Sequence, residues 1–547
     1  MDLLTALYSG AAALGLLTWL ALNRRSVPGD KAAALYLLAL AALYAALQRT
    51  SALTPHAFGT ACGLAATYAC AALGATAAYR LSPWHPCAHF PGPRVARVSS
   101  LWLSYVSFRG RRHLLLDALH ARHGVFVRIG PNIVSINAPD AQHIYSQAAR
   151  MPKADSYRAP GHDGVVALFF KQDTEKTHSE RKRVWSGLFT KEGMAQLAPY
   201  IERRTWQLLA CLERRQAASA DKSVNLADAF YHMSYDLMGD FVFGGCNRLE
   251  MMKNGDPRGM IKGGKLATIL LDSVGQTPWL LDIVWRLPLG RAMHRLTELA
   301  AELMENRLRV TEPPAFRDLV SFLTEDGSIP EKDLHLEAIV AIQGGSDNTS
   351  ITMTLATYFI TTSPHYTAAL RAELAAAFPD PTGPLPDAQL AALPLLDACI
   401  HEALRLGSPY FLPRVVPAPG AHVAGAFLPP GAIVASAAYS QQVSPEHFAP
   451  DPLAFRPERW LPGGAANRGA LASFSSGPHV CIARALAFTE MRHVLARLVL
   501  NMDVAPAPGF DARAFREGIL NMRTTILEKP FVVRVKRRAD AVPVDDA

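Results

Sequence analysis

The chain has 547 residues, a hydrophobic fraction of 50% and a formal net charge of +8. An excess of basic residues could serve nucleic-acid binding, but no basic tract is interleaved with aromatic residues. The charge therefore fits better with a membrane surface or an acidic protein partner. The seven cysteines are scattered, odd in number and contain no C-x-x-C pair, which excludes a disulfide framework and a zinc site of the usual spacing.

The first 80 residues contain three apolar runs close to membrane-spanning length: Leu3 to Leu22, Ala32 to Gln48 and Ala57 to Tyr79. A cleaved signal peptide would explain only the first run, and the basic stretch that should precede it is missing. The second and third runs are rich in alanine, so they could also pack as a hairpin or lie in the membrane interface. We predict a membrane anchor over residues 1–80, with three transmembrane helices.

Basic residues predict the orientation of this anchor. Arg24, Arg25 and Lys31 lie between the first two runs, whereas the next connection carries only Arg49 as a Lys or Arg. By the positive-inside rule, the first connection and everything after Tyr79 are cytosolic, and the N-terminus and second connection lie on the other side. We expect the endoplasmic reticulum membrane, with the rest of the chain in the cytosol.

After the anchor, residues 81–100 carry Pro83, Pro86, Pro91 and Pro93, which predict a stiff, extended hinge. Residues 101–535 are expected to form one domain, and residues 536–547 a charged tail. Within the domain, residues 125–137 alternate apolar and polar side chains around a Gly-Pro turn, which predicts a β-hairpin. Residues 139–323 are mostly helical by pattern, with breaks at 160–164, 244–245 and 254–264.

The longest helical pattern of the domain covers residues 331–364 and is apolar around most of its circumference, so it should be buried. Its centre is unusual, because Gly344 and Gly345 cost roughly 1 kcal/mol each relative to alanine in a helix interior. Polar residues follow at once, from Asp347 to Ser350. Two glycines followed by polar residues at one place in a buried helix predict a kink that leaves room for a ligand and water.

Further on, Glu402 and Arg405 share one face of a predicted helix, and Glu458 and Arg459 follow in a loop. Each pair alone would usually be a solvated surface pair. Cys481 then ends a loop with Gly477 and precedes a helical stretch that begins at Ile482. A lone cysteine is usually a small core hydrophobe, but at a helix start the dipole favours the thiolate, the form that ligates metals.

Read as F-x-x-G-x-H-x-C-x-A, the loop with Phe474, Gly477, His479, Cys481 and Ala483 resembles the haem-binding loop of the cytochrome P450 family. The resemblance implies that Cys481 is the iron ligand, that Phe474 shields the sulfur and that Gly477 permits the bend. His479 stands where the family usually has Arg, so its contact with a haem propionate should be weaker and dependent on pH.

The resemblance extends to residues elsewhere in the chain. His178 and Lys182 match a four-residue spacing that this family directs at haem propionates, although Trp185 leaves another alignment open and a solvated basic run is the alternative. Arg414 matches an Arg that sends its side chain to a propionate. Glu402, Arg405 and Arg459 would form a buried ion network beneath the haem.

In the long helix, Gly344, Gly345, Asp347 and Thr349 match the family's distal pattern, whereas Asn348 occupies the position of the usual first Thr. The resemblance implies that Asp347, Asn348 and Thr349 are catalytic. Asn cannot relay a proton as a hydroxyl does, so proton delivery should fall to Thr349 or to water held by Asp347.

The resemblance covers residues 85–535 and implies a mainly α fold with small β-sheets, preceded by the transmembrane helices. It also implies haem b, dioxygen, and electrons from NADPH through NADPH-cytochrome P450 reductase. The expected function is a monooxygenase that hydroxylates or epoxidises a small hydrophobic substrate, such as a terpenoid, in fungal secondary metabolism. Membrane lipid is an expected partner and nucleic acid is not.

Two alternatives stay open at this point. A haem-thiolate isomerase or dehydratase would need no reductase, and its activity would persist without NADPH. A non-catalytic haem-binding membrane protein would turn nothing over, and the polar, glycine-containing centre of the long helix argues against it.

The topology can be tested with engineered N-glycosylation sites in the full chain. We expect sites at the N-terminus and near residue 53 to be glycosylated and a site near residue 27 not to be, because Arg24, Arg25 and Lys31 hold that connection in the cytosol. The mobility shift of each variant before and after deglycosylation gives the answer. Glycosylation near residue 27 alone would contradict the orientation.

Overall fold

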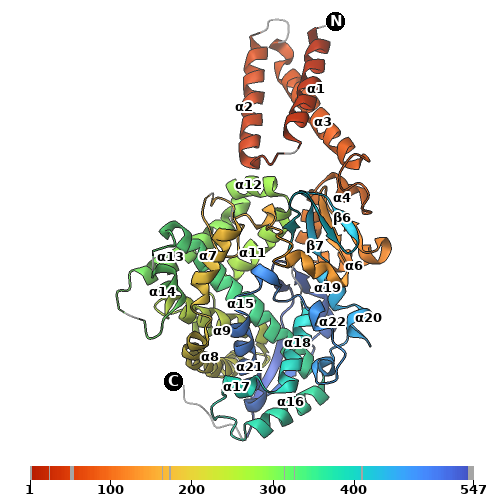
Figure 1. The fold of residues 1–547 in the computed structure, drawn as a ribbon. Coiled ribbons are helices and arrows are strands. Elements are labelled where there is room, and N and C mark those ends of the chain that lie inside the picture. The colour runs from red at the N-terminus through yellow and green to blue at the C-terminus, as the bar shows by residue number, and fades with distance from the viewer. Residues whose placement is uncertain are drawn as a thin grey trace.

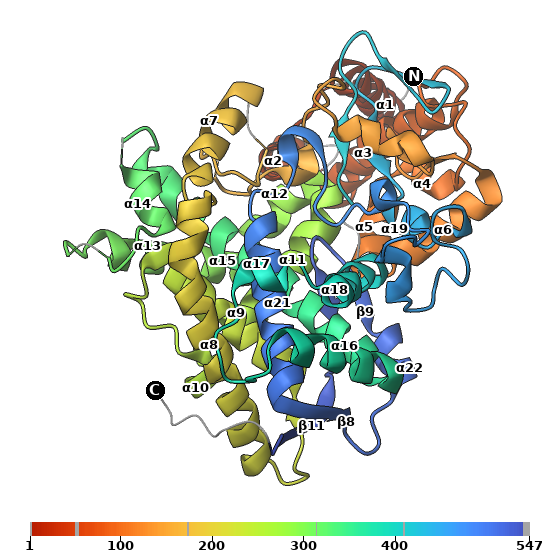
Figure 2. The same cartoon turned by 60° about the horizontal axis from the view of Figure 1, so that its bottom comes forward.

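The computed structural model describes residues 3–23, 25–49, 54–162, 164–171, 174–312, 314–325, 327–407 and 411–539. Three helices stand away from a larger, mostly helical body that also contains small sheets (Figures 1 and 2). The predicted fold class, mainly α with small β-sheets, is confirmed.

The anchor consists of α1 (Leu3–Leu22), α2 (Gly29–Gln48) and α3 (Ala57–Leu81), and all three are long and apolar enough to cross a membrane. Glycines let α1 and α3 approach closely. A Cβ on Gly15 would lie 2.5 Å from the Tyr68 carbonyl oxygen, and one on Gly63 would lie 2.3 Å from the Tyr8 hydroxyl. Such small-residue contacts are a usual way for helices to pack within a bilayer.

The body is built from helices of very different length. The longer ones are α6 (Arg112–His123), α7 (Glu175–Ser186), α8 (Lys191–Ala218), α9 (Leu226–Phe243), α11 (Met260–Ser273), α12 (Pro278–Arg286), α13 (Arg291–Leu308), α15 (Glu331–Thr361), α16 (Pro364–Ala377), α18 (Pro394–Gly407) and α21 (Arg484–Asn501). The shorter ones are α4 (Arg94–Val98), α5 (Leu101–Phe108), α10 (Met251–Asn254), α14 (Leu319–Thr324), α17 (Asp387–Leu390), α19 (Ala438–Gln442), α20 (Pro445–Phe448) and α22 (Ala512–Glu517).

Four small sheets complete the body. One has the order β1-β2-β7-β4, from strands Phe126–Arg128, Ile133–Ile136, Ile433–Ser436 and Arg414–Val415. A second has the order β3-β11-β8, from Val224–Asn225, Val532–Arg537 and Met502–Pro506. Two hairpins remain: β5 (Ala421–Val423) with β6 (Ala426–Leu428), and β9 (Ile519–Asn521) with β10 (Thr525–Leu527). The predicted hairpin at 125–137 is confirmed as β1 and β2, which pair antiparallel with Phe126 opposite Ile136.

The connection between α1 and α2 rests on α12. The Gly29 backbone N–H donates to Asp282 Oδ2 at 3.0 Å, and Arg286 Nε lies 3.2 Å from Asp30 Oδ2. The connection between α1 and α2 therefore lies on the side of the body, while the N-terminal end of α1 points away from it (Figure 1). This arrangement agrees with the orientation predicted from charge. Arg24 and residues 50–53 lie outside the described residues.

The connector differs from the extended hinge that the prolines predict. Residues 82–89 form a series of turns, and α4 follows directly. Cys87 and Phe90 are almost fully buried and pack with Val134 and Ile136 of β2. Burial of the large Phe90 side chain is favourable enough to hold the connector on the sheet instead of leaving it extended in solvent.

Two other regions differ from the predicted helices and breaks. The described residues of 139–171 contain short 3-10 turns instead of long helices. Pro139, Pro152 and Pro160 have no backbone N–H to donate, so a long helix cannot run through this stretch. The break predicted at 254–264 is shorter, since α11 already begins at Met260. There the Asp256 carboxylate accepts hydrogen bonds from the N–H groups of Met260 and Ile261, at 2.7 and 2.9 Å, and so caps the helix start.

The centre of the body is α15, which packs against α9, α13, α18 and α21 (Figure 2). The helix runs without a break through Gly344 and Gly345, and the kink predicted at these glycines stays a prediction. Apolar residues of α15 before and after the two glycines, such as Ile342 and Ile351, belong to the main hydrophobic core. A helix fixed in this way provides a rigid wall for a site.

Candidate active site

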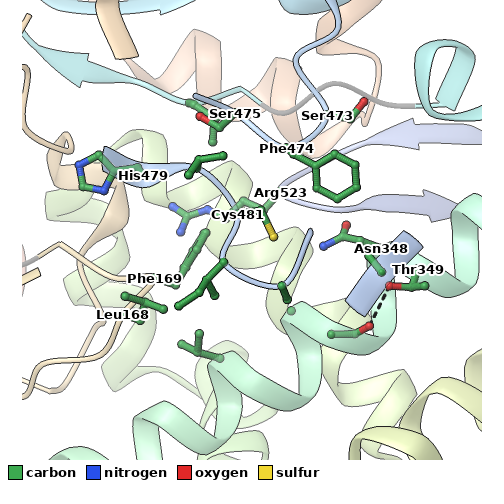
Figure 3. A pocket seen from close by; sticks show the side chains of 18 of the residues that line it. Leu168, Phe169, Asn348, Thr349, Ser473, Phe474, Ser475, His479, Cys481 and Arg523 are labelled. Atoms are coloured by element: carbon green, nitrogen blue, oxygen red, sulfur yellow. Dashed lines mark hydrogen bonds between the residues drawn. The ribbon is translucent and has the colours of Figure 1, made fainter. Parts of the chain in front are cut away.

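One cavity of about 320 Å³ lies between the loop that carries Cys481 and the central part of α15. Figure 3 shows the Cys481 sulfur directed into this space, with Phe474, Asn348 and Phe169 around it. Much of the remaining lining is apolar, including Leu168, Phe189, Met238, Val340 and Ala341. The cavity therefore offers one thiol within a largely hydrophobic enclosure.

The backbone of the loop explains how this thiol is held. A short 3-10 turn at Gly477–His479 precedes Cys481, whose N–H donates to the Phe474 carbonyl oxygen at 2.9 Å. Gly477 has a φ of +66°, and a Cβ there would lie 2.1 Å from the Tyr145 carbonyl oxygen. Only glycine fits such a close approach in the left-handed region, so the predicted bend at Gly477 has a steric cause.

The thiol itself behaves differently from the sequence prediction. Helix α21 starts at Arg484, three residues after Cys481, so the thiol lies just before the helix. Burial among protein atoms raises the pKa of Cys481, whereas the Ala483 backbone N–H and the charges of Lys182 and Arg484 lower it. Desolvation is the larger effect, which means that the helix start alone does not produce a thiolate. A bound metal cation would have to supply the remaining stabilisation.

His178 and His479 form a pair beside the loop. His479 Nδ1 lies 3.1 Å from His178 Nε2, and their ring centroids are 4.2 Å apart. Desolvation first, and then the nearby Lys153 charge, lower the pKa of His178 to about 3 and of His479 to about 2. Both imidazoles are neutral at physiological pH in this setting, and the dependence on pH that we predicted for a propionate contact of His479 stays a prediction.

Lys182 contacts the backbone of the cysteine loop. Its Nζ donates to the Pro478 carbonyl oxygen at 2.7 Å and lies 3.4 Å from the Val480 carbonyl oxygen, so it ties α7 to the cysteine loop. Arg414 lies at the start of β4, 2% exposed, with its guanidinium over the rings of Tyr145 and Tyr157. Both residues line the cavity, as His178 and His479 do.

Sequence reasoning missed two cationic residues of the cavity, Lys153 and Arg523. Lys153 Nζ donates to the carbonyl oxygens of Leu168 and Phe169 at 3.0 and 2.9 Å, and burial lowers its pKa to about 7. Arg523 lies in the turn between β9 and β10 and donates to the Ser156 carbonyl oxygen. Neither lies in a recognisable motif, because each reaches the cavity only through contacts between distant segments.

Three residues of α15 were predicted to be catalytic, and the structure brings two of them to the cavity. Asn348 and Thr349 line it together with Gly344 and Gly345. The Thr349 hydroxyl donates to the Gly345 carbonyl oxygen at 3.0 Å (Figure 3). Asp347 is not among the described residues that line the cavity. Its Oδ1 accepts a hydrogen bond from the Tyr235 hydroxyl of α9 at 3.1 Å, and burial raises its pKa to about 7.

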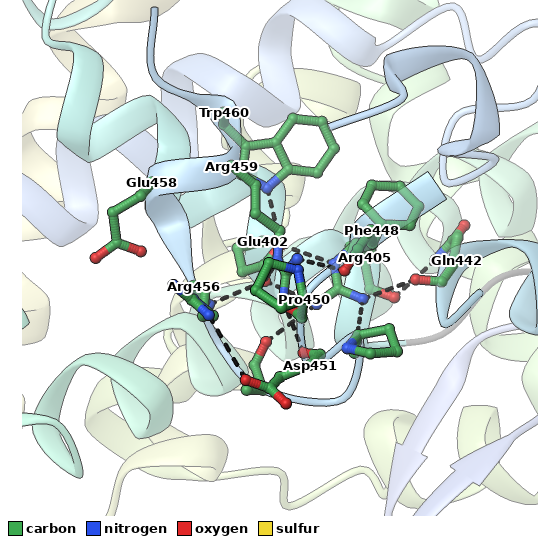
Figure 4. Close-up of polar contacts among 12 residues, drawn as sticks. Glu402, Arg405, Gln442, Phe448, Pro450, Asp451, Arg456, Glu458, Arg459 and Trp460 are labelled. Atoms are coloured by element: carbon green, nitrogen blue, oxygen red, sulfur yellow. Dashed lines mark hydrogen bonds and ion pairs between the residues drawn. The ribbon is translucent and has the colours of Figure 1, made fainter. Parts of the chain in front are cut away.

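Beneath the loop, the predicted ion network is present (Figure 4). Both Glu402 oxygens accept hydrogen bonds from Arg405, each at 2.7 Å, and Oε1 also accepts one from Arg459 at 3.3 Å. Trp460 Nε1 donates to Glu402 Oε2 at 2.8 Å. The three charged side chains are almost completely buried, so this is a structural ion network and not surface decoration.

The two arginines extend the network into the surrounding loops. Arg405 donates to the carbonyl oxygens of Gln442 and Pro452, at 2.7 and 2.5 Å. Arg459 donates to the carbonyl oxygens of Ala449 and Asp451, at 2.8 and 2.7 Å. Buried guanidinium groups need several acceptors, and these backbone carbonyls supply them. The network thereby fixes the chain segments that precede the cysteine loop.

Comparison with known proteins then decides the family. Residues 91–529 match the family model described as Cytochrome P450. The chain belongs to the cytochrome P450 family.

Among the curated relatives of this P450, the cytochrome P450 monooxygenase notG' of Aspergillus versicolor is 32% identical over 487 residues, which is 87% of each chain. Tryprostatin B 6-hydroxylase of Neosartorya fischeri is 32% identical over 461 residues, or 82% of each chain. The cytochrome P450 monooxygenase ABA2 of Pyricularia oryzae is 29% identical, over 83% of this chain and 91% of the relative. The P450 is therefore an oxidoreductase of a family that holds haem through a cysteine thiolate.

The residues present fit a haem. Cys481 is a soft ligand directed into the cavity, and solvent reaches it from there. Arg414 Nε and His479 Nε2 are buried and have no hydrogen-bond partner among the described residues. Buried polar groups normally find partners, and haem carboxylates would supply acceptors for such donors. The apolar lining of the same cavity suits the faces of a porphyrin.

The ion network gives a stability prediction. Glu402→Gln leaves Arg405 and Arg459 buried without their counter-charge, which should cost about 3 to 5 kcal/mol in free energy of unfolding. Guanidinium unfolding of the full chain in detergent, followed by tryptophan fluorescence, measures the change. Glu458→Gln is the matched control, because that carboxylate is exposed and bonds the Tyr366 hydroxyl instead of the arginines. Equal shifts in the two variants would show that the network does not stabilise the fold.

The ligand assignment gives a spectroscopic prediction. The reduced, CO-treated P450 should show the red-shifted Soret band of thiolate ligation, and Cys481→Ser should lose it because a hydroxyl is a poor soft ligand. Cys246→Ser, at an exposed cysteine, should keep the band. A band that survives Cys481→Ser would contradict the assignment.

Proposed function

We propose that this P450 is a membrane-anchored monooxygenase that inserts one atom of dioxygen into a small hydrophobic substrate, with electrons from NADPH delivered by NADPH-cytochrome P450 reductase. The observation that carries the proposal is the cavity itself. A cysteine forms one wall, α15 with two glycines and Asn348 forms the other, and apolar side chains fill much of the rest. A hydrophobic ligand can thus be enclosed next to a metal bound at Cys481.

In this proposal Cys481 would hold the iron of haem b, and Phe474 of the same loop would shield the sulfur. Arg414, His178 and His479 face the haem carboxylates, while Lys182 keeps the loop in place through the Pro478 carbonyl oxygen. Gly477 permits the bend that brings Cys481 forward. The bound haem supplies the activation of dioxygen, which a thiolate ligand promotes.

The residues of α15 hold protons at the opposite wall. Thr349 Oγ1 donates its hydrogen to the Gly345 carbonyl oxygen and keeps its lone pairs for a water or ligand in the cavity. Asn348 offers two N–H donors but no proton that it can pass on. We therefore assign proton delivery to Thr349 and orientation by hydrogen bonding to Asn348. Asp347 lies on the Tyr235 side of the helix, so it holds no water in the cavity in this proposal.

The anchor supports a place for the enzyme in the cell. Three apolar helices and the predicted orientation suit a protein of the endoplasmic reticulum membrane, with the catalytic domain in the cytosol and in contact with lipid. The fungal monooxygenases among its relatives support a role in secondary metabolism. The terpenoid class suggested from sequence remains one candidate among such hydrophobic compounds.

Expression of the full chain with and without a P450 reductase tests the reaction class. With candidate hydrophobic compounds, we expect products 16 Da heavier than the substrate by mass spectrometry, formed only when both reductase and NADPH are present. Products of unchanged mass, or 18 Da lighter, that form without NADPH would favour the isomerase or dehydratase alternative. Substrate-binding spectra without any product would favour a non-catalytic protein.

The different roles proposed for Thr349 and Asn348 predict how coupling, the amount of product formed per NADPH consumed, responds to substitution. Thr349→Val removes the hydroxyl that passes protons, so product formed per NADPH should fall several-fold and peroxide release should rise. Thr349→Ser, which keeps the hydroxyl, is the matched control and should retain most of the coupling. If Thr349→Val left coupling unchanged while Asn348→Ala abolished it, Asn348 would be the working residue and the assignment would be wrong.

A further inference from the structure

A polar end of the cavity is not used by the proposed reaction. It lies where the turn between β9 and β10 meets α11, and it contains Arg523, Asp272 and Gln276. Arg523 is placed there by packing of its guanidinium over the rings of Tyr157 and Phe169, at 5.2 and 5.9 Å from their centroids. These contacts hold the cation in one position at the cavity wall (Figure 3).

The hydrogen bonds of Arg523 are incomplete. One guanidinium nitrogen donates to the Ser156 carbonyl oxygen, whereas Nη1 is buried and has no hydrogen-bond partner among the described residues. Asp272 is the nearest carboxylate, but its ion-pair distance to Arg523 Nε is 4.0 Å. A buried guanidinium with an unused donor is costly unless an acceptor reaches it.

The local charge is not balanced either. Asp272 pairs more closely with Arg112, whose Nη1 lies 3.0 Å from Asp272 Oδ2, and both side chains are 1% exposed. One carboxylate thus stands between two arginines. Lys153 and Arg414 also lie over the Tyr157 ring, at 5.9 and 5.6 Å from its centroid, so no further carboxylate is supplied from these two contacts. Within the set of Arg112, Arg523 and Asp272, two cations therefore share one carboxylate.

We propose that Arg523 binds a carboxylate of the substrate, so that the P450 selects apolar molecules bearing one acid group. This inference rests on the proposed function and narrows its substrate class. Guanidinium and carboxylate pair through two parallel hydrogen bonds, which would fix the orientation of the substrate as well as hold it. The apolar lining accepts the rest of the molecule, and Cys481 marks the wall at which the iron would lie.

A haem propionate carries the same chemical group, so the test must separate the two sources. Dodecanoic acid and abietic acid, each with its methyl ester, serve as probes of linear and polycyclic shape. Binding to the full-length haem-loaded P450 is measured by equilibrium dialysis and by the Soret shift, and haem per chain is measured for every variant. Comparison of each acid with its ester isolates the charge, because the apolar body is unchanged.

We expect at least one acid to bind about tenfold or more tightly than its ester, as a charge-assisted pair allows. Arg523→Gln should remove this preference by weakening the acid alone, and Arg523→Lys should keep part of it. Arg513→Gln, on the exposed side of α22, should behave as the unchanged protein.

The proposal is overturned if no acid is preferred to its ester or if the preference survives Arg523→Gln. Loss of haem per chain in Arg523→Gln, with the acid preference intact, would assign Arg523 to a propionate instead. Failure of the proposed function would look different, because the unchanged protein would then lack the thiolate Soret band or form no oxygenated product, whatever the ratio of acid to ester binding.

Discussion

The structure depends on one buried carboxylate. Glu402 accepts hydrogen bonds from Arg405, Arg459 and Trp460, and the two arginines in turn bond the backbone of the loops that lead to Cys481. The same region is tied to α18 directly, since Ser473 Oγ donates to the Leu404 carbonyl oxygen at 3.3 Å. A loop that keeps its shape before a metal binds presents its thiol in place to serve as a ligand. The ion network supplies that rigidity from within the protein, where solvent does not weaken it.

The second constraint is the division of α15 into faces. Successive residues of an α-helix point about 100° apart, so Asp347 can lie behind the wall that Asn348 and Thr349 form. Asn348 and Gly344 share the cavity side, whereas Asp347 contacts Tyr235 of α9. The cavity wall therefore carries two glycines, an amide and a hydroxyl, while the Asp347 carboxyl group lies behind it. In this geometry Asn348 and Thr349 are available to form hydrogen bonds in the cavity, while Asp347 contributes to the packing of α15 against α9.

Much of the site could be predicted because its motifs are local. Glu402 and Arg405, Arg459, and the cysteine loop with Gly477 each lie in a short motif that can be recognised from residue spacing. Other features could not be predicted because they depend on segments far apart in the sequence. Arg523 meets Ser156 across 367 positions, and Lys153 is held by carbonyl groups of an irregular stretch that proline residues keep from being helical. The pKa of Cys481 was misjudged for a similar reason, since the helix start is local but the burial that raises the pKa comes from the whole fold.

The central claim is that this P450 uses the cavity between Cys481 and α15 to transfer oxygen from dioxygen to a bound hydrophobic molecule. The most direct measurement is the reaction of the full chain with reductase and NADPH under ¹⁸O₂, followed by mass spectrometry of the product. The account predicts one ¹⁸O atom per product molecule and none when only the water is labelled. Product that carries oxygen from water, or that forms without oxygen incorporation, would contradict it.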